Sequence, residues 1–414
     1  MKLLPIFFLI TMVGGQTIQR NQLKNNILPV QTGLDILLSE KTELIQSKNI
    51  GLVTNQSGVN QDSIPNYTLL LELDHIHLKA IFAPEHGFFG NFSAGHKIED
   101  QHLKEFPIIY SLYGNTRKPT LEMLDGLDLI IYDIQDIGAR FYTFISTLGL
   151  VMEAAAEAGI PVIVLDRPNP LGGLKIEGPV LDLKYSSFVG MYPIPIRYGL
   201  TIGELAKMIV GEKWIKSIPE LYVVKMQNWQ RKMTFDETGL PWIKPSPNIP
   251  DLETAIIYPG MCLLEATNMS EGRGTFQPFK KIGSPWYYDE ITMDMNGMKL
   301  SGVTFKKIKF TPKSIKGMSE NPKYLNQKCV GLKTIILDQS NYNSVETGIK
   351  FLYIAQIMTA RSFSVNSKSM NRLWGNNQLT RLLQGKGHLN KILKEINSDE
   401  ALFRTQRNPY LLYD

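Results

Sequence analysis

One stretch of the sequence decides the fold, and it reads LKAIFAPEHGFFG over residues 78–90. Its first six residues are mostly apolar and predict a short buried strand, which Pro84 and Glu85 follow at once. Ligands bind at the carboxyl ends of the strands in an open α/β sheet, so Glu85 and His86 predict a functional site. The alternative is that Glu85 only caps or stabilises a turn.

Three further apolar segments are predicted to form strands that end in polar loops. They cover residues 49–54, 127–132 and 161–165. A helix is predicted over residues 147–158, with Gly159 as its C-terminal stop. Apolar strands separated by helices predict a parallel sheet that is covered on both faces. We therefore expect an α/β fold in which the polar loops gather at one edge of the sheet.

The region after residue 250 is predicted to form a second domain. Four prolines in residues 241–250 exclude both helix and central strand, so this segment is predicted to be a rigid loop at a domain junction. Strands are then expected over 303–310 and 331–337, and helices over 342–360 and 376–396. The sequence thus predicts an N-terminal α/β domain over 28–250. It also predicts a smaller C-terminal α/β or α+β domain with a mixed sheet over 251–414.

Composition and charge limit the class of protein. The chain has 414 residues, of which 43% are hydrophobic and 20% charged, which is typical of a soluble protein with a full core. The net charge of +5 is small and spread along the chain, unlike the basic patch of a nucleic-acid-binding protein. We therefore expect no nucleic-acid partner.

Residues 1–16 have the pattern of a secretory signal peptide. Lys2 gives a short positive region, residues 3–13 are almost wholly apolar, and two small residues precede polar sequence. The apolar run is too short to span a bilayer, and no later run is long enough. The sequence predicts a secreted or periplasmic protein without a membrane span. In such a compartment Cys262 and Cys329 either pair or remain two buried thiols.

Two groups of candidate residues follow the predicted strands. Glu85 in a pocket could serve as a general acid, while His86 could orient it, bind substrate or ligate a metal. Asp133 and Asp136 could bind sugar hydroxyls or a divalent cation. Alternatively, these two acids form an ion-paired turn with Arg140.

Two further groups lie in glycine- and proline-rich loops. Asn169 follows another strand, and Glu177 is placed where its loop should cover the same edge of the sheet. Glycoside hydrolysis usually needs two carboxylates, so Glu177 is the candidate for the second, although a purely structural loop is the alternative. Arg273, between two glycines, suits the capture of a carboxylate. Its partners within the protein could equally be Glu265 and Glu271.

Several known motifs are absent from the sequence. The first strand is not followed by G-x-G-x-x-G, and there is no Walker motif, which disfavours nucleotide binding. The chain also lacks G-x-S-x-G, H-E-x-x-H and cysteine-rich metal spacing. We expect neither a cofactor nor a bound metal.

Taken together, the motifs resemble the exo-β-N-acetylmuramidase family, long catalogued as a domain of unknown function. The resemblance covers roughly residues 49–286 and is looser beyond them. It rests on 83–88 (APEHGF), 110–114 (YSLYG), 133–142 (DIQDIGARFY), 166–170 (DRPNP), 177–179 (EGP), 237–242 (ETGLPW), 245–248 (PSPN) and 267–275 (TNMSEGRGT).

The resemblance implies a Rossmann-like N-terminal domain that acts as a scaffold without a dinucleotide, with the site in the cleft between the domains. It implies release of N-acetylmuramic acid from the non-reducing ends of peptidoglycan fragments. Glu85 matches the catalytic glutamate of the family. Glu177 is our choice for the second carboxylate, with Asp136 and Glu271 behind it. Phe89 stands where the family pattern has arginine, which bears on substrate preference but not on the reaction.

The predicted substrate-binding residues are His86, Asn55, Asp136, Arg140, Asn169, Glu271 and Arg273. Among them, His86 and Asn169 would hold hydroxyls or the N-acetyl group, and Arg273 would pair with the lactyl carboxylate of muramic acid. Two other functions stay open at this point. One is a metal-dependent hydrolase with His86, Asp133 and Asp136 as ligands, and the other is a cell-wall sugar-binding protein without catalysis.

Overall fold

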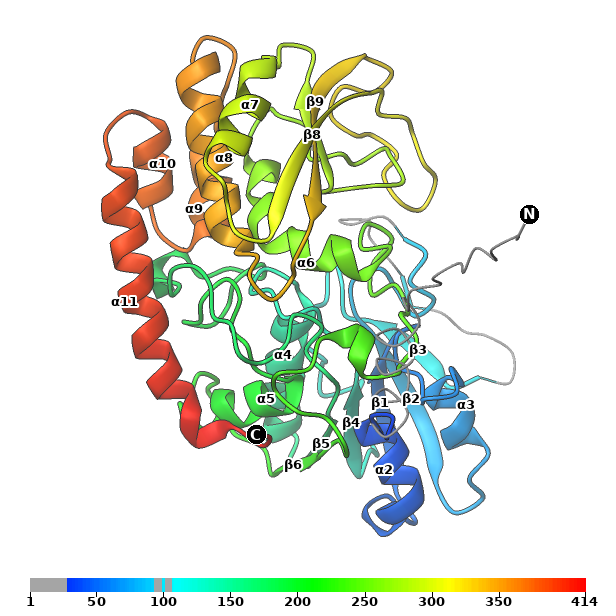
Figure 1. Cartoon of the computed structure of the whole chain (residues 1–414). Helices are drawn as coiled ribbons and strands as arrows, with labels where there is room; N and C mark the ends of the chain where they lie inside the picture. Colours follow the sequence, from blue (N-terminus) through cyan, green and yellow to red (C-terminus); the bar gives the residue numbers. More distant parts are fainter. Residues whose placement is uncertain (1–27, 93–98, 101–105) are drawn as a thin grey trace, which may run out of the picture.

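The N-terminal half of the chain forms a six-stranded parallel sheet in the computed structural model, which describes residues 28–92, 99–100 and 106–414. The strand order is β3-β2-β1-β4-β5-β6, the order of a dinucleotide-binding Rossmann fold. This sheet lies in the lower lobe of Figure 1. It confirms the predicted α/β class, whereas the predicted signal peptide lies outside the described residues.

Its strands are β1 Asn49–Thr54, β2 His77–Ala83, β3 Ile108–Ser111, β4 Leu129–Asp133, β5 Val162–Leu165 and β6 Leu221–Val224. The four central strands, which are mostly apolar, were all predicted from the sequence. The two edge strands, β3 and β6, were missed, because each has only four residues and is partly exposed. Such short half-exposed segments carry little pattern.

The helices of this domain are α2 Gly33–Glu40, α3 Asn66–Leu71, α4 Phe144–Glu157 and α5 Ile202–Gly211. Successive residues of a strand point to opposite faces of the sheet. Ile131 of β4 accordingly packs in the apolar cluster with α2, while Ile130 and Tyr132 pack in the cluster with α4 and α5. Helix α4 starts three residues before its predicted beginning. It ends at Glu157, and Gly159 follows the C-cap Ala158 with a φ of 71°, which is suited to a residue without a Cβ.

The C-terminal domain has a three-stranded sheet in the order β7-β9-β8. Its strands are β7 Lys281–Ser284, β8 Val303–Phe310 and β9 Cys329–Ile336, and its helices are α6 Leu252–Met261, α7 Asp289–Gly297, α8 Ser344–Thr359, α9 Ser367–Trp374, α10 Gln378–Leu383 and α11 Leu389–Arg407. Both strand pairs are antiparallel, so the prediction of a mixed sheet is wrong. The single helix predicted over 376–396 is also wrong, because Gly385, with a φ of 72°, separates α10 from α11.

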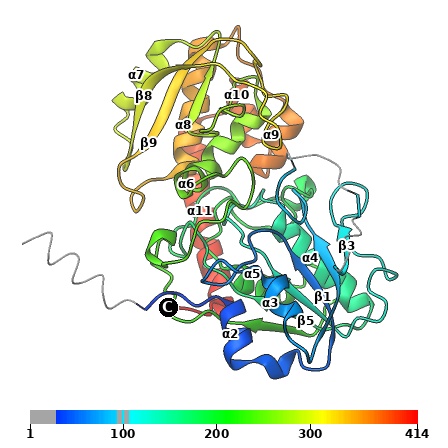
Figure 2. The same ribbon diagram turned by 90° about the vertical axis from the view of Figure 1, so that its right-hand side faces the viewer.

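Helix α11 runs along both lobes (Figures 1 and 2), and its contacts join them. Asp399 and Glu400 each accept a hydrogen bond at 3.0 Å from the backbone of the N-terminal domain, from the amides of Val180 and Gly178. Arg407 donates to the carbonyl of Gly199 at 2.5 Å. One apolar cluster also extends from the large sheet into the C-terminal helices. The two domains are therefore packed together over a wide area.

None of the helices in the described part of the chain has both the length and the apolar character needed to cross a bilayer. Cys262 and Cys329 are both buried, and each is a free thiol. The fold is thus held by packing and hydrogen bonds rather than by a disulfide between these two residues.

Candidate active site

The dinucleotide crevice of a Rossmann fold would lie between the ends of β1 and β4, where the strand order reverses. Here the carboxylate of Asp133 receives two hydrogen bonds from Arg167, at 2.6 and 2.9 Å, and both side chains are buried. The space left beside Arg167 is about 20 Å³, far below the roughly 300 Å³ of a small ligand site. Protein side chains thus fill this crevice.

The same ion pair bears on the metal-ligand hypothesis. Asp133 also accepts from the Asn66 side chain at 2.7 Å, so both of its oxygens are engaged. Asp136 accepts from the amide of Gly138 at 2.6 Å and from the hydroxyl of Tyr198. Within residues 28–92, 99–100 and 106–414 no group of three His, Cys, Asp or Glu residues is arranged to hold a metal ion. The geometry therefore does not favour the metal-dependent hydrolase.

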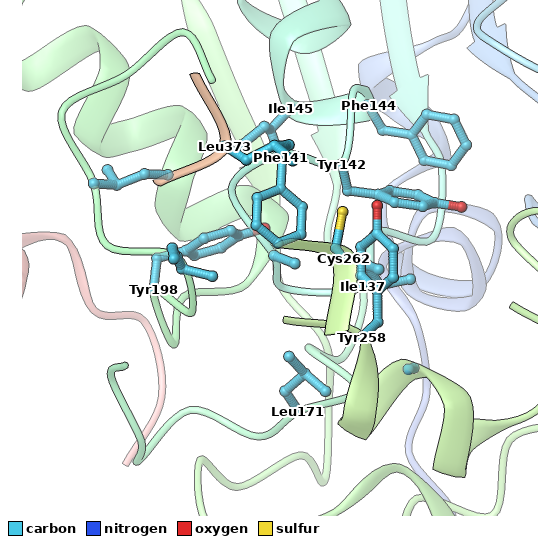
Figure 3. Packing of buried hydrophobic residues seen from close by; sticks show 14 of the residues in the cluster. Ile137, Phe141, Tyr142, Phe144, Ile145, Leu171, Tyr198, Tyr258, Cys262 and Leu373 are labelled. Atoms are coloured by element: carbon cyan, nitrogen blue, oxygen red, sulfur yellow. The ribbon is translucent and has the colours of Figure 1, made fainter. Parts of the chain in front are cut away.

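A different cavity, of about 110 Å³, lies between the two domains and contains Glu85. The N-terminal domain and the junction loop contribute to its wall the side chains of Glu85, His86, Tyr142, Thr143, Ser246 and Asn248. The C-terminal domain contributes those of Tyr258, Cys262, Glu265, Arg273, Phe279 and Leu373. Part of this wall is seen in Figure 3, where Tyr142, Tyr258 and Cys262 lie close together. The expected location in a cleft between domains thus matches this cavity.

Glu85 is held at the end of β2 by a defined contact. The hydroxyl of Thr143 donates to Glu85 Oε2 at 2.7 Å, which fixes the carboxyl group at the cavity wall. The next residue, His86, has a φ of 72°, a left-handed conformation that is uncommon outside glycine. Burial lowers the pKa of His86, so its imidazole is neutral near pH 7. Its Nδ1 lies 2.8 Å from the carbonyl oxygen of Phe92.

The opposite wall is built around Arg273. Its Nη2 donates to Glu265 Oε1 at 2.6 Å, and its Nε lies 3.6 Å from Glu271 Oε1. Lys323 donates to the other oxygen of Glu271 at 2.9 Å. The guanidinium of Arg273 lies over the ring of Phe279. The backbone of Phe279 has a φ of 62°. His86 and Phe279 thus both line the cavity with positive-φ backbone, a conformation that is often found at functional sites.

Two buried polar atoms at this cavity lack a hydrogen-bond partner among the described residues. They are the hydroxyl of Tyr142 and Oδ1 of Asn248. Burial raises the pKa of Tyr142 well above its ordinary value and the charges of Asp136 and Glu85 add to this effect, while the neighbouring Ser246 side chain and the charge of Arg273 oppose it. Burial also raises the pKa of Asp136 to about 6. Unpaired buried polar groups are rare in native proteins. The Tyr142 hydroxyl and Asn248 Oδ1 therefore mark positions where a polar substrate is expected to bind.

The other predicted site residues lie elsewhere or behind the wall. Asn169 is used internally, since Nδ2 donates to the carbonyl of Leu200 at 2.8 Å and Oδ1 accepts from the amide of Leu171 at 2.9 Å. Asn55 accepts at Oδ1 from Ser57 and does not line the cavity. Glu271 lies behind Arg273 rather than facing the cavity.

Arg140 is fully buried and acts as a link between the domains. Its terminal nitrogens donate to four backbone carbonyls, those of Pro179, Ile194, Leu373 and Trp374, at 2.7–2.9 Å. The first two belong to the N-terminal domain and the last two to the end of α9. The geometry therefore gives Arg140 a structural role rather than the expected role in substrate binding.

Glu177 is not brought to the Glu85 cavity. Its Oε1 accepts from Arg197 at 2.6 Å, and its Oε2 accepts from the amide of Val345 at 3.1 Å, at the start of α8. It lines a separate, larger pocket of about 480 Å³. The expectation that Glu177 faces Glu85 across one site is thus not met by the geometry. Within the cavity, the carboxylate that accompanies Glu85 is Glu265.

Sequence reasoning did not single out Thr143, Tyr258 or Phe279. Thr143 directly follows the motif over 133–142, so proximity to that motif was the available signal. Tyr258 lies in an apolar helix, α6, and nothing in its local pattern distinguishes it from a core residue.

Fold and site together define a two-domain α/β protein of Rossmann type with a carboxylate-bearing cavity between the domains. Comparison with known proteins makes the class specific. The chain belongs to the exo-β-N-acetylmuramidase NamZ family, since the models of the family's N-terminal and C-terminal domains match residues 50–253 and 256–413.

Among curated proteins, the peptidoglycan β-N-acetylmuramidase NamZ of Bacillus subtilis (strain 168) is 40% identical over 413 residues, which cover 99% of this chain and 97% of the relative. Two crystal structures of DUF1343 family proteins from Bacteroides fragilis NCTC 9343 are also similar. The first has a TM-score of 0.85 at 34% identity and covers 93% of this chain and 99% of its own. The second has a TM-score of 0.73 at 33% identity and covers 94% and 99%.

Proposed function

We propose that this chain is an exo-acting glycoside hydrolase that releases N-acetylmuramic acid from the non-reducing ends of peptidoglycan fragments. The observation that carries the proposal is the cavity between the domains, where Glu85 and Glu265 lie among polar groups that lack protein partners. Two carboxyl groups at one site are the usual machinery of glycoside hydrolysis. The full-length similarity to a peptidoglycan β-N-acetylmuramidase supports the same substrate class.

In this mechanism Glu85 is the general acid. It donates its proton to the glycosidic oxygen while the bond between that oxygen and C1 of the muramic acid breaks, so the leaving sugar departs with a hydroxyl group. Thr143 holds Glu85 in position for this transfer. One water supplies the hydroxyl group that C1 gains and one proton. If Glu265 is the base it takes this proton, and exchange with solvent then returns both carboxyl groups to their starting states, whereas if Glu265 is the nucleophile Glu85 takes the proton from the water directly.

We assign the second carboxylate to Glu265, which would act as the base for the attacking water or as a nucleophile at C1. Arg273 fixes its orientation at 2.6 Å. Arg273 Nη1 makes no hydrogen bond within the described part of the chain, and we assign it to the lactyl carboxylate that distinguishes muramic acid from glucosamine. The hydroxyl of Tyr142 and Oδ1 of Asn248 would bind the hydroxyls or the acetamido group.

One assay tests these roles together. It measures release of 4-nitrophenol from 4-nitrophenyl N-acetylmuraminide and from the N-acetylglucosaminide. We expect Glu85→Gln to lower kcat on the muraminide by about 10²–10⁴-fold. Arg273→Ala should weaken turnover of the muraminide far more than that of the glucosaminide. Full activity of Glu85→Gln would move the acid to another residue, and an absence of wild-type turnover on both sugars would refute the proposal.

We also propose that the protein is exported, because its substrate lies outside the cytoplasm and residues 1–16 have a signal-peptide pattern. Mass spectrometry of protein recovered from the periplasm or medium should show a chain that begins near residue 17. A chain that retains Met1 and stays in the cytoplasm would contradict export.

A further inference from the structure

Phe276 is the most exposed of the large apolar side chains in the described part of the chain. Its exposed fraction is 80%, whereas a Phe side chain normally contributes to a core. It lies between Arg273 and Phe279, both of which line the Glu85 cavity. The ring is thus exposed on a short loop whose two ends, at Arg273 and Phe279, line the cavity.

The loop that carries Phe276 is fixed by its own hydrogen bonds. Phe279 donates its amide to the carbonyl of Glu271 at 2.6 Å, and the Thr275 hydroxyl donates to the carbonyl of Gly272 at 2.8 Å. Gly274, with a φ of 79°, accepts from the amide of Lys313 at 2.8 Å. This bonding holds the loop in one conformation, so little conformational freedom is lost when a ligand binds to the ring.

The cavity has a closed end and an open rim. Ile249, Cys262 and Phe279 are at most 1% exposed and form its buried part, whereas Glu85, Glu265 and Arg273 are only partly buried. An exo-acting enzyme takes the terminal sugar into the closed end, so the rest of the glycan leaves over the rim. Phe276 lies on the loop that joins Arg273 and Phe279, three residues from each of these cavity-lining residues.

We propose that Phe276 is a stacking platform for the sugar on the leaving-group side of the scissile bond, which in a peptidoglycan fragment follows the muramic acid. This inference rests on the proposed function and adds a specificity-determining residue to it. A pyranose presents a face of C–H groups that packs on the face of an aromatic ring, and a ring of this size offers a large contact area. The contact would position the glycosidic oxygen near Glu85.

The test compares two substrates that share the muramic acid. One is the disaccharide of N-acetylmuramic acid β-linked to N-acetylglucosamine, and the other is β-N-acetylmuraminyl fluoride, whose leaving group has no sugar to stack. Phe276→Ala should lower kcat/KM on the disaccharide by about tenfold, the value of one lost contact of roughly 1.4 kcal/mol, and change kcat/KM on the fluoride less than twofold. Phe276→Trp should restore the disaccharide rate.

Tyr222→Ala is the matched control, because Tyr222 is an exposed aromatic residue on the edge strand β6 and should leave both rates unchanged. Equal losses of Phe276→Ala on both substrates, or no loss on either, would overturn the platform. If the wild type hydrolyses neither substrate, the proposed function itself fails, and the platform fails with it. Wild-type turnover of both substrates with an unaffected Phe276→Ala variant removes the platform alone.

Discussion

Two pockets of the molecule contain glutamates, and the pocket in which we expect catalysis is the smaller of the two. The pocket around Glu177 has a volume of about 480 Å³, and the cavity around Glu85 has about 110 Å³. In the larger pocket the carboxylates are paired within the protein. Glu177 binds Arg197, and Glu346 binds Lys350, both at 2.6 Å.

The smaller cavity also holds paired carboxylates, since Glu85 accepts from Thr143 and Glu265 from Arg273, but it differs in its other polar groups. Its carboxylates are Glu85 and Glu265, and the hydroxyl of Tyr142 and Oδ1 of Asn248 have no partner among the described residues. The comparison teaches that unpaired buried polar groups, rather than volume, distinguish the cavity suited to chemistry from a polar space between two domains. Each prediction below tests one side of this comparison.

The largest expected effect is on stability, from Glu177→Ala. The substitution removes a buried partner of Arg197 and the acceptor for the Val345 amide, and breaking a buried ion pair costs about 3–5 kcal/mol. Glu177→Gln keeps the acceptor and should cost less. Denaturation by urea measures the loss. The kcat/KM of the folded fraction on the muraminide should change less than threefold, because Glu177 does not line the catalytic cavity.

This prediction also decides between the two assignments of the second carboxylate. A Glu177→Gln variant that unfolds like the wild type but has lost turnover would return Glu177 to the mechanism. It would also make the comparison of the two pockets invalid. Glu265→Gln is the companion variant, and it should lose turnover while its unfolding stays close to that of the wild type.

A smaller effect is expected from Tyr142→Phe, and its effect on stability should not share the sign of that of Glu177→Ala. The substitution removes one buried hydroxyl without a partner, so the free energy of unfolding should stay the same or rise. The kcat/KM on the muraminide should fall by about 3–10-fold, the effect of one hydrogen bond. A Tyr142→Phe variant with lower stability and unchanged kinetics would show that the hydroxyl serves the fold. The two readouts are thermal unfolding and steady-state kinetics.

Much of the fold follows from local pattern, as β1 and α4 show. The strand over residues 49–54 has an apolar interior, and Gly159 follows the end of α4 in the structure as predicted from the sequence. The position of Glu85 is equally local, since it follows the end of β2 directly. Rules for strands and caps involve neighbouring residues, so one sequence contains the information.

The missed features depend on contacts between distant residues. Arg140 reads as a charged site residue, yet its partners include the carbonyl of Leu373, 233 positions away. The pairing of Glu177 with the start of α8 is of the same kind, with 168 positions between the glutamate and Val345. Charge and spacing identify a residue that needs a partner but not whether that partner is a substrate or the protein itself.

The smallest expected effect concerns Glu400, at the contact between α11 and the Glu177 loop. Burial raises the pKa of Glu400 to about 7 from an ordinary value of 4.5, and the nearby charges of Glu177 and Glu346 add to this. A carboxyl group with a raised pKa in the folded state binds its proton more tightly there than in the unfolded chain. Its contribution to stability is therefore complete below about pH 4.5 and is lost as the pH rises to about 7.

Glu400→Gln should remove this pH dependence while it keeps an acceptor for the Gly178 amide. Because the group is partly exposed, we expect the variant to exceed the wild type by only about 1 kcal/mol at pH 8 and to equal it at pH 4. Thermal unfolding at both pH values measures the difference, and Glu395→Gln, which alters a half-exposed carboxyl group on α11, is the control. A gain at pH 4 as large as at pH 8 would mean that packing, not proton binding, governs this contact.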